Sequence, residues 1–297
     1  MNDFRLIVFL SVARNLNFTK AAQELGISQP AISKHINELE SNYGVQLFER
    51  SKSKVTLTSS GEVFKAFAQS LVDKYKDLEF EMNLLSHNDT GEIVIGASTT
   101  IAQYVLPKII SKFMSRFPNI KLSLVSGNTN YIESLISSNK IDLGLVEGAT
   151  HKKDFHYRFF AHDELVLISS TKNKVEEVSL QELLLLPLVL RENGSGTLEV
   201  IINELKDRRI SLSELNLRIQ LGSSEAIKRY VIDGNSYAIV SVAAIIDELK
   251  HNELRIIDIK DVELKRDFSF ISRIGSQNRL AEKFADFTLA ITKSYYR

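Results

Sequence analysis

Apolar residues in the first sixty positions recur every three or four residues, the spacing that places them on one face of a helix. The pattern predicts a helix over residues 4–14 and a second helix from a cap at Thr19 to Leu25. Gly26 supplies a turn that is free to take a positive φ, and Ser28 can cap a third helix behind it. Two short helices joined by such a turn are typical of a helix-turn-helix.

A hairpin and a long helix are predicted next. Two β-prone runs, VQLF and VTLT, flank the basic segment RSKSK, so we expect a wing beside the third helix. The spacing of Ser59 and Glu62 predicts a capping box that opens a helix over residues 60–86. This helix ends at the polar segment 87–91. Its apolar positions, three and four residues apart, are Phe64, Phe67, Leu71, Tyr75, Leu78, Met82 and Leu85.

The apolar stripe of the long helix has two possible partners. One is a lobe of the same chain, and the other is the same helix in a second copy. A helix over residues 60–86 spans about 40 Å at about 1.5 Å per residue, which is more than one small lobe can cover. We therefore expect this helix to dimerise and to place two helix-turn-helix units about a two-fold axis.

The remaining two hundred residues alternate between predicted strands and helices. The first set of apolar runs is IVIGAS, IKLSLVSG and IDLGLVEG, with helical segments between them. A second set repeats the theme with ELVLISS, PLVLRE, RIQLGSS and YAIVSV. Strands that alternate with helices in this way predict an α/β sheet with parallel crossovers, built twice.

Composition limits the classes of protein that remain. With 297 residues the chain can form two or three domains. It has no cysteine, which excludes disulfides, thiolate metal sites and thiol redox chemistry. The start of the chain lacks a basic region and a cleavage site, so we expect a cytoplasmic protein without a membrane partner. Residues 1–60 carry seven Lys/Arg against five Asp/Glu, so charge supports DNA binding only through placement.

One long stretch carries a family resemblance. FTKAAQELGISQPAISKHINELESNYGVQLFER, followed by VTLTSSGE, resembles the DNA-binding domain of the LysR-type transcriptional regulators, and the resemblance extends along the whole chain. In the second half, RENGSGT and GSSEAIKRYVIDG resemble the branch that regulates sulfur assimilation and carbon fixation. The chain departs from that branch at Leu198, where arginine is usual, and at Ser236, which replaces a glycine.

The resemblance implies the architecture of the molecule. We expect an all-α winged helix-turn-helix and a linker helix, followed by an α/β effector domain with the two lobes of a type II periplasmic-binding-protein fold. The expected boundaries are 1–58 for the winged helix-turn-helix, 59–90 for the dimerising linker helix and hinge, 91–161 with 266–297 for lobe I, and 162–265 for lobe II.

Polar residues of the third helix and the wing are candidates for DNA contact. Amide and hydroxyl groups suit base edges, lysine suits phosphate or guanine, and a basic hairpin can reach phosphates or the minor groove. The alternative is a solvated helix face with ordinary surface charge. The candidate DNA-binding residues are Thr19, Ser28, Gln29, Ser33, Lys34, His35, Arg50, Lys52 and Lys54.

A second group of candidates follows the predicted strands. Ligands of open α/β sheets bind beyond the carboxyl ends of the strands, and hydroxyls and N–H groups at helix N-termini bind anions. Each of these turns could instead be an ordinary helix cap. With tryptophan and cysteine absent, the lining favours a small anionic effector over a flat aromatic one. The candidate effector-binding residues are Ser98, Thr99, Thr100, Thr129, Asn193, Ser195, Thr197 and Ser224.

Catalysis is not expected. RENGSGT lacks the Gly-Lys-Ser/Thr ending of a phosphate loop, and the chain carries no nucleophile elbow, zinc-binding helix or dinucleotide fingerprint. We expect no cofactor and no metal.

The expected partners are an inverted-repeat operator in double-stranded DNA, further copies in a homodimer or dimer of dimers, and RNA polymerase. Two alternatives stay open: a ligand-independent regulator with a vestigial cleft, and a solute-binding protein, against which the DNA-binding domain argues.

Overall fold

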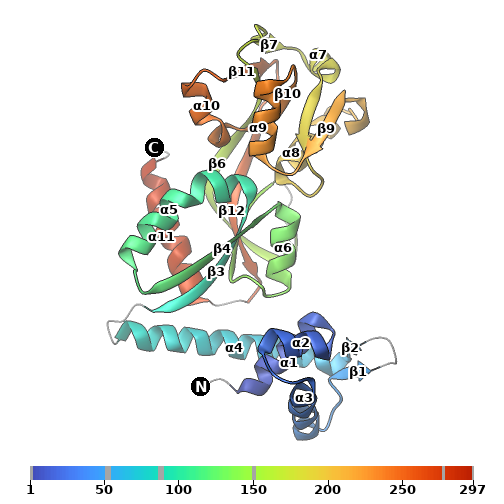
Figure 1. Ribbon diagram of the computed structural model, residues 1–297, viewed down its shortest axis with the longest axis vertical. Helices are drawn as coiled ribbons and strands as arrows, with labels where there is room; N and C mark the ends of the chain where they lie inside the picture. The colour runs from blue at the N-terminus through green and yellow to red at the C-terminus, as the bar shows by residue number, and fades with distance from the viewer. Residues whose placement is uncertain (1–2, 51–54, 86–89, 149–151, 276–277, 296–297) are drawn as a thin grey trace. The chain divides into compact units, whose positions relative to one another are not determined.

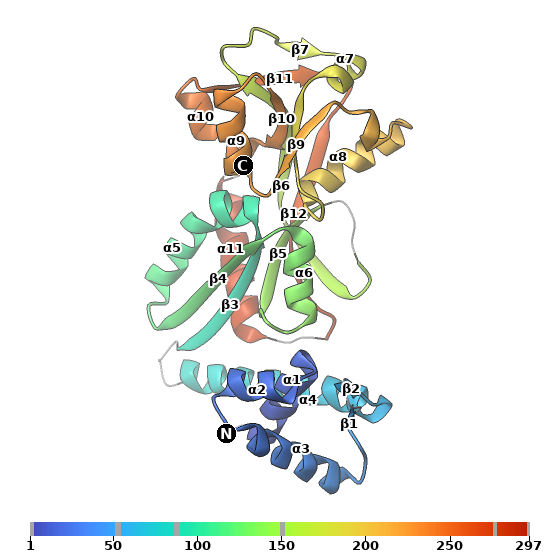
Figure 2. The ribbon, with the colours of Figure 1, turned by 45° about the vertical axis from the view of Figure 1, so that its right-hand side comes forward.

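The computed structural model describes residues 3–50, 55–85, 90–148, 152–275 and 278–295. They form two compact units, one with the elements from α1 to α4 and one with the elements from β3 to β12 and α11 from Ala281 onward (Figures 1 and 2). The first unit contains α1 (Phe4–Asn15), α2 (Phe18–Leu25), α3 (Gln29–Tyr43), β1 (Phe48–Arg50), β2 (Val55–Leu57) and α4 (Ser59–Leu85).

The predicted helix-turn-helix is confirmed, with one change at the start of α2. The side chain of Ser28 accepts the N–H of Ala31 at 3.3 Å and caps α3 as expected. The cap of α2, however, is Asn17, which accepts the N–H groups of Thr19 and Lys20 at 2.9 and 3.0 Å. The prediction that Thr19 caps this helix is wrong, because the helix already begins at the buried Phe18.

The start of α4 also differs from the expectation. Thr58 is the cap, since its hydroxyl accepts the N–H of Gly61 at 2.9 Å and donates to the carbonyl of Gln46 at 2.7 Å. The helix therefore begins at Ser59, whereas a cap at Ser59 would start it at residue 60. The predicted capping box is wrong. The second bond explains the difference, because it ties the cap to the segment that leads into the wing.

The three short helices pack around a common apolar core. Phe9 is fully buried, and its ring centroid lies 5.2 Å from that of Phe48 in the wing and 4.7 Å from that of Phe64 in α4. The buried carboxylate of Glu40 accepts the N–H groups of Leu47 and Phe48 at 2.8 and 3.2 Å. The core and this bonded carboxylate hold the wing against α3.

The wing is the predicted hairpin. β1 and β2 pair antiparallel, with Phe48 opposite Leu57. Lys52 and Lys54, which we expected to contact DNA, lie outside the described residues, as does the side chain of Arg50.

The second unit is built on a ten-stranded sheet. Along its main path the strand order is β4-β3-β5-β12-β6-β10-β8-β9, and β11 and β7 continue from β6. The strands are β3 (Gly91–Ser98), β4 (Ile120–Gly127), β5 (Leu143–Gly148), β6 (Phe155–Ser170), β7 (Glu177–Val178), β8 (Leu188–Arg191), β9 (Leu217–Leu221), β10 (Tyr237–Ser241), β11 (Leu254–Ile259) and β12 (Leu264–Arg273). The helices are η1 (Ile101–Val105), α5 (Leu106–Arg116), α6 (Thr129–Ser137), α7 (Leu180–Leu185), α8 (Gly196–Asp207), η2 (Leu212–Glu214), α9 (Ser224–Asp233), η3 (Val242–Ala244), α10 (Ile246–Lys250) and α11 (Arg279–Tyr295).

This sheet forms the two expected lobes. We call the half with β3, β4 and β5 lobe I and the half with β8, β9 and β10 lobe II, and within each half these strands pair parallel. In lobe I, α6 covers one face of the sheet and α5 with α11 the other (Figures 1 and 2). Two long antiparallel strands, β6 and β12, run through both halves. The lobe boundaries that we expected after residues 161 and 265 fall inside these strands and stay predictions.

The predicted helix near residues 101–117 begins with a π-helical turn. Over Ile101–Val105 the chain makes this wider turn, and the N–H of Leu106 bonds to the carbonyl of Ile101. Pro107 follows and has no N–H, so a regular helical ladder cannot run through it. The wider turn places Tyr104 at the carboxyl end of the lobe I sheet.

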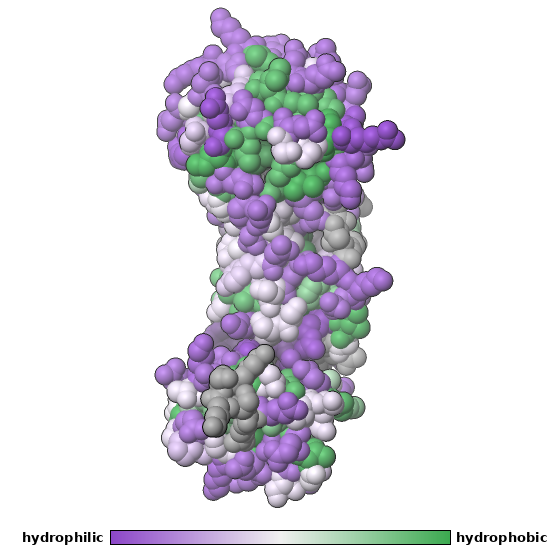
Figure 3. Space-filling view, turned by 90° about the vertical axis from the view of Figure 1, so that its right-hand side faces the viewer, coloured by the Kyte–Doolittle hydropathy of each residue, from purple (hydrophilic) through white to green (hydrophobic). Residues whose placement is uncertain are grey.

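Lobe II carries apolar side chains on its surface. They gather over the part that holds α7, α8 and β9 (Figure 3). Leu185, Leu217 and Ile219 are exposed there, and β9 is an edge strand of the sheet. Leu198, one of the two departures from the family pattern, is instead buried in the core of this lobe. Within the described ranges, no helix combines the length and the apolarity needed to cross a membrane.

Candidate functional site

The exposed face of α3 is a polar strip. Ile32, Ile36 and Leu39 point into the core, which leaves the opposite side of the helix to solvent. On that side the amide of Gln29 donates to the hydroxyl of Ser33 at 2.9 Å. The strip is shallowly concave and is lined by Gln29, Pro30, Ser33, Lys34, Asn37, Glu38, Ser41 and Asn42. Amide, hydroxyl and ammonium groups in a row match the edges and phosphates of a DNA groove.

The other predicted DNA-binding residues lie around this strip. The hydroxyl of Ser28 caps α3, and Thr19 is exposed on the first turn of α2. His35 lies apart from the strip, because its ring packs edge-on against Phe4 with centroids 5.6 Å apart. Its Nδ1 lies 3.7 Å from the carboxylate of Glu38. The structure therefore brings together Gln29, Ser33 and Lys34 and separates His35 from them.

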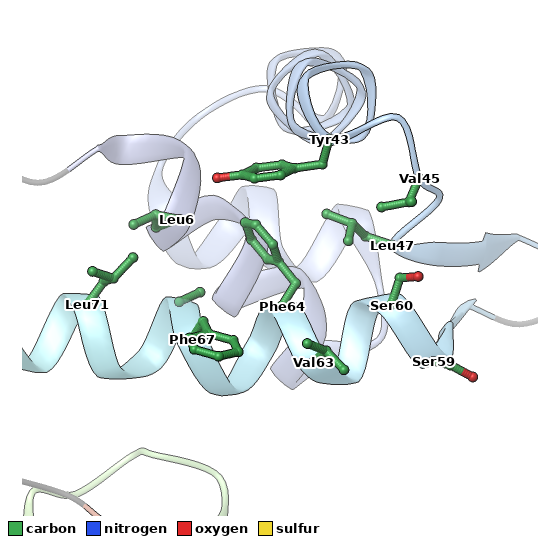
Figure 4. A pocket seen from close by; sticks show the side chains of 11 residues that line it. Leu6, Tyr43, Val45, Leu47, Ser59, Ser60, Val63, Phe64, Phe67 and Leu71 are labelled. Atoms are coloured by element: carbon green, nitrogen blue, oxygen red, sulfur yellow. The ribbon is translucent and has the colours of Figure 1, made fainter.

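An apolar groove runs beside α4 in the same unit (Figure 4). Its volume is about 640 Å³, and its wall includes Tyr43 and Val45 from the end of α3 and the turn after it. Phe67 is 69% exposed at its edge, although it is a large aromatic residue. The complete lining is Leu6, Tyr43, Val45, Leu47, Ser59, Ser60, Val63, Phe64, Phe67, Ala68 and Leu71.

The predicted stripe of α4 is thereby divided in two. Phe64 is partly buried and packs against the buried Phe9 and the exposed Tyr43 of its own unit. Phe67, Leu71, Leu78 and Met82 are exposed along the helix. The side chain of Leu85 lies outside the described set.

In the second unit, a buried carboxylate occupies the meeting point of the two lobes. Glu147, near the end of β5, is 2% exposed. Its side chain accepts the hydroxyls of Ser98 at 2.9 Å, Thr100 at 3.2 Å and Thr197 at 3.4 Å. Its carbonyl accepts the hydroxyl of Thr129 at 2.9 Å. Four of the hydroxyls expected to bind an effector therefore bind a residue of the chain itself.

An arginine on a crossing strand balances this carboxylate. Arg266 of β12 is buried, and its Nη1 lies 3.1 Å from Glu147 and donates to the hydroxyl of Thr197 at 2.8 Å. Its Nε bonds to Asp163 of β6 at 2.7 Å, and the same carboxylate accepts the hydroxyl of Ser241 at 2.7 Å. Burial raises the pKa of Asp163, although the charge of Arg266 and these bonds oppose that effect. Two carboxylates thus share one guanidinium where the lobes meet.

A second arginine lies at the end of β8. Arg191 is 1% exposed, and its Nε and Nη2 donate to Glu192 at 2.8 and 3.0 Å. Glu192 also accepts a bond from Asn128 of lobe I at 3.1 Å. Burial disfavours the ionised form of Glu192, but the bonds and charge of Arg191 outweigh it and leave its pKa below the ordinary value.

A third set of contacts joins the lobes on the side of α9. The hydroxyl of Tyr104 in the π-helical turn donates to Glu225 of α9 at 2.5 Å. Lys228, which is buried, bonds to Glu225 and to Glu248 at 2.7 Å each and lies 4.9 Å from the centre of the Tyr104 ring. Burial and the neighbouring carboxylate of Glu225 raise the pKa of Tyr104, so the phenol stays a hydrogen-bond donor.

The remaining predicted effector residues divide by exposure. Thr99 and Ser195 are buried near Glu147, and neither hydroxyl has a hydrogen-bond partner among the residues that the structure describes. Ser224 is buried in the first turn of α9, whereas Asn193 is exposed in the loop after β8. Their grouping around the sheet ends agrees with the expectation, but the charged residues between them were not foreseen.

Two of those charged residues carried a signal in the sequence. Glu147 and Arg191 each stand at the end of a run that is otherwise apolar, LGLVEG and PLVLRE. Arg266, in contrast, lies between the charged residues Lys265 and Asp267 and carried no such signal. A charge in a buried strand is rare unless it is paired. Such positions could have been selected as candidates, but their partners come from other strands and helices and could not be identified.

Comparison with known proteins covers both units. The profile described as bacterial regulatory helix-turn-helix protein, lysR family, matches residues 4–62, and that of the LysR substrate binding domain matches residues 86–292. The HTH-type transcriptional regulator CysL of Bacillus subtilis is 30% identical over 295 residues, 98% of this chain and 97% of that protein. A probable RuBisCO transcriptional regulator of Thalassiosira pseudonana is 31% identical over 288 residues, 94% of each chain.

A solved structure resembles the second unit. The regulatory domain of CcmR from Synechocystis PCC6803, in complex with 2-PG, aligns with a TM-score of 0.63 and 26% identity. The alignment covers 69% of this chain and 98% of that one. These relatives support the branch that the motifs of the second half had indicated.

Proposed function

The chain belongs to the LysR family of DNA-binding transcriptional regulators, and from this membership we propose how it acts. It binds an inverted-repeat operator as a homodimer or a pair of dimers, and it responds to a small anion that binds between the lobes of its sensor. Because a regulator of transcription works where the chromosome is, we place it in the cytoplasm.

The polar strip of α3 carries the DNA-binding part of the proposal. Gln29, Ser33 and Lys34 lie side by side on the solvent face of a helix whose other face is fixed in the core. A recognition helix reads bases with short polar side chains near its N-terminus, and these three residues occupy its first two turns. We assign base contact to Gln29 and Ser33 and phosphate contact to Lys34.

Binding-site selection from random double-stranded DNA tests this assignment. We expect an inverted repeat, with affinity that falls steeply as salt rises. Replacing Gln29 by Ala should weaken binding to the selected site by about 1–3 kcal/mol and relax the base preference at one position in each half-site. Lys34→Ala should weaken all sequences alike.

His35→Ala serves as the matched control on the same helix, because His35 packs against Phe4. It should leave the base preference unchanged. If Gln29→Ala kept both the affinity and the base preference of the wild type, the assignment of α3 would be wrong.

The apolar groove beside α4 supports assembly from copies of this chain. Phe67, Leu71, Leu78 and Met82 continue the groove as an exposed apolar row along the helix. A second α4, which has the same row, would cover it symmetrically. We assign the dimer seam to α4 and the groove, and the exposed apolar surface of lobe II to the contact between dimers.

The effector part of the proposal rests on the meeting point of the lobes. Buried arginines, hydroxyls and the N-terminus of α8 lie there, and such groups bind anions. The CcmR regulatory domain, which resembles this unit, binds the small molecule 2-PG. An effector can regulate only if it favours one arrangement of the lobes or subunits over another. We therefore expect it to change the footprint on the operator.

One observation favours a ligand-independent regulator as the second candidate. The carboxylate of Glu147 already occupies the hydroxyls of Ser98, Thr100 and Thr197. Calorimetric titration of the full chain with sulfate, sulfite, phosphate and small carboxylic acids separates the two candidates. Heat of binding together with an altered footprint supports the sensor, whereas neither effect supports the ligand-independent regulator.

A further inference from the structure

Arg191 has a donor that its own chain does not use. Its guanidinium has five N–H donors, and Glu192 accepts one bond from Nε and one from Nη2. Nη1 is buried and has no hydrogen-bond partner in the described part of the chain. A buried donor on a cation is costly to leave unsatisfied, so this atom marks a position suited to an acceptor.

Ser195 has the same property at the start of α8. Other cap residues of this chain accept a backbone N–H, as Asn128 does from Tyr131 and Ser223 does from Ala226. Ser195 is the cap residue of a twelve-residue helix, yet its hydroxyl makes no cap bond. The hydroxyl is buried and without a partner among the described groups. It is therefore available to a ligand at a helix N-terminus, where negative charge is favoured.

Thr99 supplies a third buried hydroxyl without a partner within the described ranges. It lies next to Ser98, which bonds to Glu147. Gly196, the neighbour of Ser195, packs so closely on Glu147 that a Cβ there would lie 2.0 Å from its carbonyl oxygen. Both hydroxyls thus belong to segments that meet at Glu147.

Glu147 decides which side of this meeting point can receive an anion. Its carboxylate accepts hydrogen bonds from three hydroxyls. Together with Asp163 it places two negative charges beside the single positive charge of Arg266. A further negative charge beside it would be repelled. Among the described residues, Arg191 and Arg266 each keep a buried guanidinium nitrogen without a hydrogen-bond partner. Arg266 already faces both Glu147 and Asp163, whereas Arg191 pairs with Glu192 alone, so the favourable position is on the Arg191 side.

We infer that Arg191, Ser195 and Thr99 form the anchor for an oxyanion group of the effector, such as a carboxylate, a phosphate or a sulfur oxyanion. The inference rests on the proposed function, because it requires that the sensor bind a small anion. It makes Arg191, which was not among the candidates from the sequence, the residue that determines specificity for charge. The hydroxyls bonded to Glu147 then hold the lobes and not the anion.

The test uses the full chain and the anions named above. In titrations with the anion that binds wild type best, Arg191→Lys should raise Kd by about tenfold or more, because an ammonium group lacks the planar pair of donors that grips an oxyanion. Ser195→Ala and Thr99→Val should each raise Kd severalfold. Arg158→Lys is the matched control, since Arg158 pairs with Asp286 on the surface of lobe I. It should bind as wild type does.

The outcomes separate the anchor from the proposed function. If the anion binds wild type and all three cleft variants with the same Kd, the anchor is overturned while the sensor stands. If none of the anions binds wild type, the anionic effector and its anchor are both overturned, and operator binding still reports on the DNA-binding unit. Should Arg191→Lys fail to fold, as circular dichroism would show, Ser195→Ala and Thr99→Val carry the test.

Discussion

Gly61 lies at a close approach between the linker helix and the wing with the residue that leads into it. A Cβ added to it would lie 2.1 Å from the carbonyl oxygen of Leu47 and 2.9 Å from a methyl group of Leu57. The residue lies in the first turn of α4, so the requirement for glycine comes from packing and not from an unusual φ. Because the nearest atom belongs to the backbone, it cannot move aside as the end of a flexible side chain would.

We therefore expect Gly61→Ala to destabilise the DNA-binding unit by about 2–3 kcal/mol, the upper range for an overpacked site. Thermal unfolding followed by calorimetry should show a lower transition temperature, and operator binding should be lost at lower temperature. Gly222→Ala is the matched control, because nothing lies within 4 Å of a Cβ at that position. Equal unfolding temperatures for the two variants would contradict the close packing of α4 on the wing.

At the scale of elements, the π-helical turn of lobe I and α9 of lobe II are joined through one carboxylate. Burial opposes ionisation of Glu225, but the bonds from Lys228 and Tyr104 outweigh it and hold its pKa below the ordinary 4.5. A lowered pKa means that the ionised group stabilises the fold. This contribution is complete above about pH 4.5 and is lost as the pH falls through the lower value of the folded chain.

Chemical denaturation at several pH values checks this link. Between pH 5 and pH 3, the free energy of unfolding of the sensor should fall less for Glu225→Gln than for wild type, because glutamine has no charge to lose. Glu253→Gln, a change at an exposed position, should follow the wild-type profile. Parallel profiles for wild type and Glu225→Gln would show that this carboxylate does not hold the lobes together.

The elements that the sequence predicted correctly are those fixed by local spacing. The helices of the first unit follow from apolar residues three and four apart, and Ser28 caps α3 as expected. The cap at Asn17 was missed because the burial of Phe18, which sets the start of α2, depends on the wing and α1. β12 was implied only by the family resemblance, since its place between β5 and β6 depends on partners about one hundred residues away.

The residues of the sensor site could likewise be predicted only where local sequence determines them. Hydroxyls after the strands could be identified from the sequence, because helix caps and strand ends have local signatures. The hydrogen-bond partners of these hydroxyls could not be identified, since Ser98, Thr100 and Thr197 bond to a carboxylate on a different strand. Which hydroxyls are bonded and which are free depends on the pairing of buried charges across the lobes, and no spacing rule contains that information.

At the scale of the whole molecule, the proposed dimer depends on the exposed row of α4. We expect Leu71→Asp and Leu78→Asp to break the dimer, because each would place a charge in an apolar seam. Light scattering should show smaller species, and operator binding should fall although the polar strip of α3 is unchanged. Lys74→Asp, a charge change at an exposed position of the same helix, is the control. Unaltered dimers in both leucine variants would exclude α4 as the main seam.

The place of β12 has a consequence for the order in which the protein is made. The ribosome releases the DNA-binding unit first, and that unit closes its own core with α1 to α4. The sheet of lobe I, in contrast, has β12 between β5 and β6, so its centre stays open until residues 264–273 have been synthesised. The other strands of lobe II are therefore synthesised while the sheet of lobe I is still incomplete. A nascent chain can thus acquire its operator-binding surface before it can sense any effector.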